Sequence, residues 1–333
     1  MGIDTQVGLG LAIPRPILKV ATRVALLLLI PMVLSYALYG ISALVCLVMG
    51  YLVSLAPSEM VPARAALALS LPGAAAGVVA VSVHGDALPA ACLVAVASLL
   101  IAPANMHQNG LLAGIPTITA ILTTIPLDLD PAFTGIWMLI GSAAVVAVVA
   151  PVRHEGEHQQ VDPKVAWFHA SAMALVVGPM VYALTVTGVP RAHWIAMTMT
   201  VVLRPYGRET QNVARQRVIG TFGGAMLALG LAVVVPQWAA LAISSLLLIL
   251  MFGYMLLDRY ALAVAAVTPL VVLIAAGGGT EPTMDAALLR VGATMLGALI
   301  AGVLALALLR FERTHLSPED APDAPSAAPP AGP

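Results

Sequence analysis

Residues 193–225 read HWIAMTMTVVLRPYGRETQNVARQRVIGTFGGA, and this stretch decides the fold. An apolar run ends at Leu203, a basic segment follows, and a second apolar run begins near Val218. The basic segment has four arginines and a single acidic residue, Glu209. Lys and Arg concentrate in cytoplasmic loops next to transmembrane helices. The stretch therefore predicts two membrane-spanning helices joined on the cytoplasmic side.

Composition extends this interpretation to the whole chain. Of the 333 residues, 60% are hydrophobic and only 9% are charged. A soluble domain has about 25% charged residues, so this chain cannot cover a water-exposed surface. Apolar runs of about 20 residues, enough to cross the hydrocarbon layer, recur from Ala21 to Leu309. Alternating apolar and polar strands are not seen, which favours an all-α polytopic membrane protein.

Polar residues divide the chain into about twelve predicted transmembrane helices. The apolar run that follows the first basic residues continues to Ala56, which favours a first helix over a cleaved signal peptide. The predicted spans are 21–38, 41–56, 64–83, 87–104, 111–127, 132–151, 166–187, 191–204, 217–235, 238–257, 260–276 and 287–309. We predict a cytoplasmic N-terminal segment (1–20), a first transmembrane repeat (21–151), a cytoplasmic linker (152–164), a second repeat (165–310) and a disordered cytoplasmic tail (311–333).

The distribution of basic residues predicts the orientation. With a cytoplasmic N-terminus, thirteen of the fifteen Lys and Arg residues fall on the inner side, and only Arg191 and Arg290 fall on the outer side. The outer loops carry acidic residues instead, including Asp128 and Glu281. We therefore expect a multi-pass protein of the bacterial inner membrane with both termini in the cytoplasm.

The two halves of the sequence carry matching landmarks. Arg64 and Arg217, Pro116 and Pro269, and three further pairs are each separated by 153 positions. Upstream of these pairs, Pro57 and Pro205 also match, but they are separated by 148 positions. The second half therefore has five extra residues between Pro205 and Arg217. Six spans in each half predict two parallel six-helix repeats, an arrangement in which transporters form substrate sites between the repeats.

The opening stretch also resembles a known family. A Trp opens a span (Trp194), Arg204-Pro205 ends it, and the next helix carries R-x-x-G-T-x-x-G from Arg217 to Gly224. This pattern is similar to the repeat signature of the fusaric-acid-resistance/aromatic-acid-exporter-like (FUSC) family, as is the closing helix at 288–310. The resemblance covers residues 165–310; in the first half, Cys46 replaces the Trp. It implies efflux of small amphipathic, often aromatic, organic acids, with a periplasmic adaptor as a partner.

The four arginines of the basic segment have two interpretations. They anchor the helix ends to lipid phosphates, or they form a cationic vestibule that pairs with carboxylates. We predict that Arg208 and Arg215, in the middle of the loop, are anchors. Arg204 and Arg217, at the helix ends, are candidate substrate-binding residues.

Further candidate substrate-binding residues lie near the predicted helix ends. Trp194 opens the eighth span, and His169 lies one turn into the seventh. Asp258 and Arg259 end the tenth span, where we expect them to form a local ion pair.

Small residues one helical turn apart allow helices to approach closely in lipid. Gly220 and Gly224 have this spacing, as do Ala293 with Gly297 and Ala298 with Gly302. We predict a helix-packing motif made of Gly220, Thr221, Gly224, Gly297 and Gly302.

The sequence motifs of known enzyme classes do not indicate an enzymatic function for this chain. Residues 154–158 read HEGEH, which fits the zinc-protease pattern H-E-x-x-H, but they lie in a polar linker without a third ligand. Neither a G-x-S-x-G nor a Walker A motif occurs. We expect no catalytic residue, metal or cofactor, and we interpret Cys46 and Cys92 as buried small side chains.

Together these observations favour an inner-membrane exporter of small organic anions. A major-facilitator-type carrier shares the 6+6 plan but requires a charged loop motif that residues 57–64 (PSEMVPAR) lack. A non-transporting membrane scaffold for envelope assembly is the alternative from another class. The expected partners are membrane lipids and the organic anion, and we expect no binding of nucleic acid. The sequence leaves open whether the protein forms a homo-oligomer.

Overall fold

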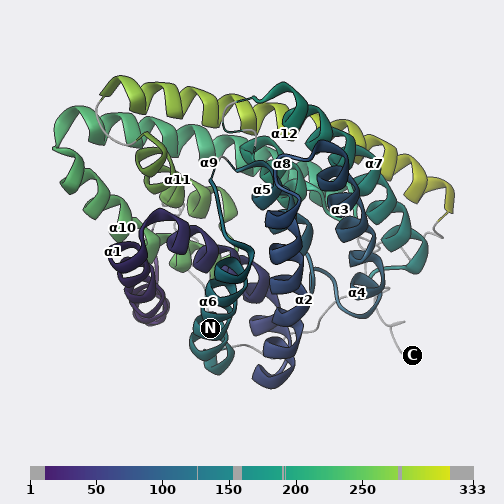
Figure 1. Ribbon diagram of the computed structural model, residues 1–333, viewed down its shortest axis with the longest axis horizontal. Coiled ribbons are helices and arrows are strands. Elements are labelled where there is room, and N and C mark those ends of the chain that lie inside the picture. Colours follow the sequence, from purple (N-terminus) through teal and green to yellow (C-terminus); the bar gives the residue numbers. More distant parts are fainter. Residues whose placement is uncertain are drawn as a thin grey trace, which may run out of the picture.

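The structure is a computed structural model that describes residues 12–125, 127–152, 160–189, 191, 193–276 and 280–315. All regular elements within these ranges are helices (Figure 1). They are α1 (Arg15–Met60), α2 (Ala63–Ser82), α3 (Ala87–Leu99), α4 (Ile101–His107), α5 (Gly114–Thr124), α6 (Pro131–Val149), the 3-10 turn η1 (Ala150–Val152), α7 (Pro163–Thr187), α8 (His193–Val202), α9 (Gly207–Val234), α10 (Gln237–Met255), α11 (Tyr260–Ala276) and α12 (Thr280–His315).

Among the described residues, eight helical segments are long and apolar enough to cross a membrane. Three further apolar helices, α5, α8 and α11, are shorter. The protein is thus an all-helical, multi-pass membrane protein. The first two predicted spans lie together on α1, and the predicted span 87–104 is divided between α3 and α4, so the predicted count of twelve spans is not confirmed.

The kink in α1 explains why the sequence indicated two spans there. Gly40 has φ 77° and ψ −165°, which interrupts the helix between the two predicted spans. Positive φ values are readily adopted by glycine because it has no Cβ. The predicted loop between 38 and 41 is therefore a bend within one 46-residue element.

α9 begins ten residues before its predicted start. Only residues 203–206 connect it to α8, and most of the predicted basic loop forms the first turns of α9. Gly207, Thr210, Ala214 and Arg217 are buried at intervals of three or four residues, as on one face of a helix. A search for continuous apolar runs cannot detect this amphipathic segment.

α12 also extends past its predicted end, through residues 311–315 of the predicted tail. Phe311 stacks on Phe168 of α7, with 4.1 Å between the ring centroids. The Glu312 carboxylate accepts a 2.8 Å hydrogen bond from the backbone N–H of Gly207 at the start of α9. Both contacts hold the last turn of α12 in place. The rest of the tail and the HEGEH segment lie outside the described residues.

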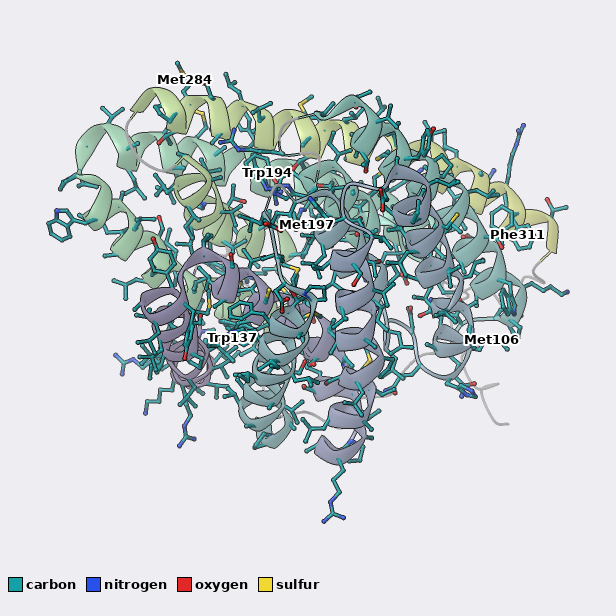
Figure 2. The ribbon with its side chains drawn as sticks, viewed as in Figure 1. Met106, Trp137, Trp194, Met197, Met284 and Phe311 are labelled. Carbon is teal, nitrogen blue, oxygen red and sulfur yellow. The ribbon has the colours of Figure 1, made fainter. Side chains whose placement is uncertain are left out.

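The first helix of each half packs against the other half. α1 contacts α10, and α7 contacts α3 and α4, so segments far apart in sequence lie side by side (Figure 1). Within the halves, α2 meets α5 and α6, while α9 meets α11 and α12. Met197 of α8 packs against the apolar clusters of both halves and lies near the centre of the molecule (Figure 2).

Close helix contacts surround three of the five residues in the predicted packing motif. A Cβ at Gly220 would overlap the Ala261 carbonyl oxygen of α11, and one at Gly224 would lie 2.7 Å from the Ala265 oxygen. A Cβ at Gly297 would lie 2.9 Å from Thr198 of α8. Gly302, in contrast, has no neighbour within 4 Å of its Cβ position. Thr221 is buried.

Gly220→Leu should therefore destabilise the protein. The added side chain must push α9 away from α11, and overpacking of this kind costs about 1–3 kcal/mol. Gly230→Leu is the matched control on the same helix, because nothing lies within 4 Å of that Cβ position. Thermal unfolding in detergent and abundance in membranes should both fall for Gly220→Leu alone. Normal stability with lost transport would instead place Gly220 on the substrate path.

Candidate functional site

Three neighbouring helices of the second half each carry a pair of buried functional side chains, spaced one turn apart. α12 packs against both α8 and α9. The pairs are Trp194 and Thr198 on α8, Arg217 and Thr221 on α9, and Arg290 and Thr294 on α12. All six are at most 9% exposed. We call this set the α8–α9–α12 cluster.

Arg290 is a buried cation that has no anionic partner among the residues that the structure describes. It lies ten residues into α12 and is 3% exposed. Its Nε and Nη1 have no hydrogen-bond partner among the described residues. Its Cζ lies 5.4 Å from the centre of the Trp194 ring, a cation–π contact. Arg290 lies within the predicted span 287–309, and its side chain is enclosed by the helix bundle.

Arg217 is the second buried cation of the cluster. Its Nη1 donates a 3.0 Å hydrogen bond to the Tyr260 hydroxyl at the start of α11, while its Nε has no partner. The charges of Arg217 and Arg290 lie close enough to repel each other. Among the residues that the structure describes, no carboxylate pairs with either guanidinium.

Trp194 is covered by cations rather than free to stack on a ligand. Arg191, in the connection before α8, places its Cζ 5.5 Å from the centre of the same ring. The Nη2 of Arg191 also donates a 2.9 Å hydrogen bond to the Ala275 carbonyl at the end of α11. Trp194 therefore positions Arg191 and Arg290.

Buried hydroxyl groups lie one helical turn after Trp194, Arg217 and Arg290 on the same helices. The hydroxyls of Thr198, Thr221 and Thr294 are buried and have no hydrogen-bond partner among the described residues. Buried polar groups are normally hydrogen-bonded, so three such hydroxyls on the three helices of the cluster are unusual. All of these groups can donate hydrogen bonds to an anion.

The electrostatics of the cluster favour an anionic ligand. Arginine at the centre of a membrane helix costs about 2.5–3.5 kcal/mol on insertion scales. A carboxylate that bridges two guanidiniums would offset part of this cost, because charge-assisted hydrogen bonds contribute about 1.5–3 kcal/mol each. The arrangement can therefore bind a carboxylate.

Two other predicted site residues meet near the start of α7. His169 is 3% exposed and lies beside the Leu203 backbone and the Arg204 charge, with neither ring nitrogen in hydrogen-bonding geometry. Arg204 is half-buried, and its backbone N–H and C=O both bond to the Thr210 hydroxyl. This pair is therefore separate from the α8–α9–α12 cluster.

The remaining pair lies in the turn between α10 and α11. Asp258 is exposed and has φ 54°, while Arg259 is half-buried with its Nη1 unpartnered. The expected ion pair between them is wrong, since the structure contains none. Asp258 instead lies near Glu59 at the end of α1.

The sequence interpretation brought together Trp194 and Arg217 and assigned Thr221 to helix packing. It missed Arg290, Tyr260, Thr198 and Thr294. Arg290 was detectable, because an arginine inside an otherwise apolar helix marks a functional site by default. Its distance from the outer loop was underestimated, since α12 begins at Thr280 rather than 287. Tyr260 and the threonines carry no sequence signal of this kind.

Metal-ligating residues do not gather in the described part of the chain. No group of three or more His, Cys, Asp or Glu is placed there to hold a metal ion. Cys46 is buried as expected, whereas Cys92 is exposed on α3, contrary to the expectation of burial. Both are free thiols.

Comparison with known proteins gives one match. The family described as fusaric acid resistance protein-like matches residues 168–304, a range that contains the entire α8–α9–α12 cluster. No curated protein and no solved structure matched the chain. The family match confirms the resemblance seen in the arginine-rich stretch: residues 168–304 of this membrane protein carry the pattern of the fusaric acid resistance protein-like (FUSC) family.

Proposed function

We propose that this protein exports small organic anions and that the α8–α9–α12 cluster binds them. The family points to a membrane transporter with an efflux-related role. The observation that carries the proposal is the pair of buried guanidiniums, Arg217 and Arg290, with no carboxylate of the described chain to neutralise them. A site of this kind has no catalytic group, and we propose no enzymatic reaction.

In this proposal each residue has a separate task. The forked guanidiniums of Arg217 and Arg290 bind the two carboxylate oxygens. Tyr260 orients Arg217 through its hydroxyl, and Trp194 orients Arg290 through the cation–π contact. The threonine hydroxyls supply the remaining hydrogen bonds. Amphipathic, often aromatic, acids fit because the surroundings of the cluster are apolar.

We further propose that the chain forms twelve spans in two parallel six-helix repeats. The offset of 153 positions and the recurring contacts of α1 with α10 and α7 with α3 support this arrangement. Rocking of the two halves, at the contacts of α1 with α10 and of α7 with α3, would open the site alternately to each side of the membrane.

The first half lacks the cluster, so the proposed protein has a single site. At the repeat positions of Trp194, Arg290 and Thr294 stand Cys46, Trp137 and Gly141. A Cβ at Gly141 would overlap the Leu47 carbonyl oxygen, so α1 and α6 pack there without room for side chains. This half would serve as the rigid support of the binding half.

The proposed orientation can be tested by cysteine labelling. In a variant without native cysteines, Gln160→Cys before α7 should react only from the cytoplasm, and Asp128→Cys between α5 and α6 only from outside. Both positions are exposed. Labelling of residue 160 by an impermeant reagent in intact cells would reverse the proposed map.

Transport is tested by uptake of labelled benzoate into vesicles loaded with unlabelled benzoate. The purified protein should exchange the two, and Arg217→Lys together with Arg290→Lys should abolish exchange without changing the amount of reconstituted protein. Arg208→Lys together with Arg215→Lys is the matched control, because both residues are exposed on α9. Absence of exchange for aromatic and aliphatic acids alike would favour the scaffold.

A further inference from the structure

An apolar groove lies beside the α8–α9–α12 cluster. It has a volume of about 590 Å³, within the range of small-molecule sites, and it opens on one side. One wall is Val189, Arg191 and Ile195, and the other is the face of α12 from Asp285 to Leu296. α12, which forms this second wall, is a candidate membrane span.

Arg191 links this groove to the buried arginines. It lines the groove, and its guanidinium covers the Trp194 ring that also contacts Arg290. The Arg191–Trp194 contact therefore lies between the groove and the proposed carboxylate site.

We infer that the groove holds the apolar body of the exported acid while the carboxylate binds the buried arginines, so that the substrates are carboxylates with an apolar body larger than one aromatic ring. This inference rests on the proposed function. Arg191 and Asp285 are the charged residues of the groove. Asp285 repels a carboxylate from its end of the groove, and Arg191 attracts it to the end nearest the cluster.

Gly292 offers a direct way to block the groove. It lines the groove, and nothing lies within 4 Å of its Cβ position. Gly292→Leu therefore fills the groove without displacing any helix. Gly302→Leu is the matched control, because Gly302 lies on the same helix with equally free space and outside the groove.

The test measures the affinity of the purified full-length protein for benzoate, naphthoate and biphenylcarboxylate. In the wild type, affinity should rise with the size of the apolar body. Gly292→Leu should weaken binding of biphenylcarboxylate by about tenfold or more, because the apolar contact of one ring is lost. The affinity for benzoate should stay unchanged. Gly292→Ala should give a smaller loss, and Gly302→Leu none.

The outcomes separate this inference from the proposed function. Wild-type affinity of Gly292→Leu for biphenylcarboxylate, or an equal loss for benzoate, would overturn the groove assignment. If Arg290→Met binds all three acids as well as the wild type, the buried arginines do not hold the carboxylate and the proposed function fails.

Discussion

Arg290→Met should strongly weaken carboxylate binding and, at the same time, stabilise the ligand-free protein. Methionine keeps a long side chain but removes a buried charge that has no partner among the described residues. Replacing a buried charge by an apolar group of similar volume is often neutral or stabilising by about 1–4 kcal/mol. Loss of one charge-assisted hydrogen-bonding group should weaken binding by about 10- to 100-fold.

The control for this prediction is Arg215→Met on the exposed face of α9. It removes one positive charge without changing the buried cluster, so both the unfolding temperature and the affinity for benzoate should stay at wild-type values. Adding benzoate should stabilise the wild type and Arg215→Met, since a ligand that binds the folded state raises its stability. A lower unfolding temperature for ligand-free Arg290→Met would show that Arg290 is a structural residue.

Lysine substitution should separate binding arginines from anchoring ones. Lysine keeps the charge but cannot form the two parallel hydrogen bonds of a guanidinium. In the wild type, Nη1 of Arg217 bonds to Tyr260 and its Nε is available to the ligand. Lysine at this position cannot make both bonds. Arg217→Lys should therefore reduce benzoate affinity by about tenfold or more, which is the scale of one lost charge-assisted hydrogen bond. Binding is measured by calorimetry on each purified variant.

The other arginines of the basic stretch are the internal controls. Arg208 and Arg215 are exposed on the first turns of α9, so their lysine variants should bind benzoate as the wild type does. Arg204 was also a candidate, but it lies with His169 near the start of α7, and we now expect Arg204→Lys to be neutral. If all four lysine variants bind benzoate with wild-type affinity, the arginines of the basic stretch only anchor the helix ends.

The all-helical, multi-pass architecture was predictable because apolar runs report directly on membrane burial, whereas the count of twelve spans is not confirmed. The helix ends were less predictable where a helix leaves the apolar layer. α9 begins with polar residues that bury one face, and α12 ends with Phe311 and Glu312, which dock onto α7 and the start of α9. These ends depend on tertiary contacts that hydropathy does not encode.

The candidate site was predictable only in part, for a similar reason. Trp194 and Arg217 carry a motif, but the cluster depends on how α12 packs between α8 and α9. That packing places Arg290 on Trp194, although 96 positions separate them in the sequence. A single sequence has no signal for such a contact.

The central claim is that two buried guanidiniums bind a carboxylate, and it is tested most directly by titrating the purified wild-type protein with benzoate and with benzamide. The two compounds share shape and ring but differ in charge. We predict saturable binding of benzoate and at least tenfold weaker binding of benzamide, since the amide forms no charge-assisted bonds. Equal binding of the two compounds, or tighter binding of benzamide, would contradict the account.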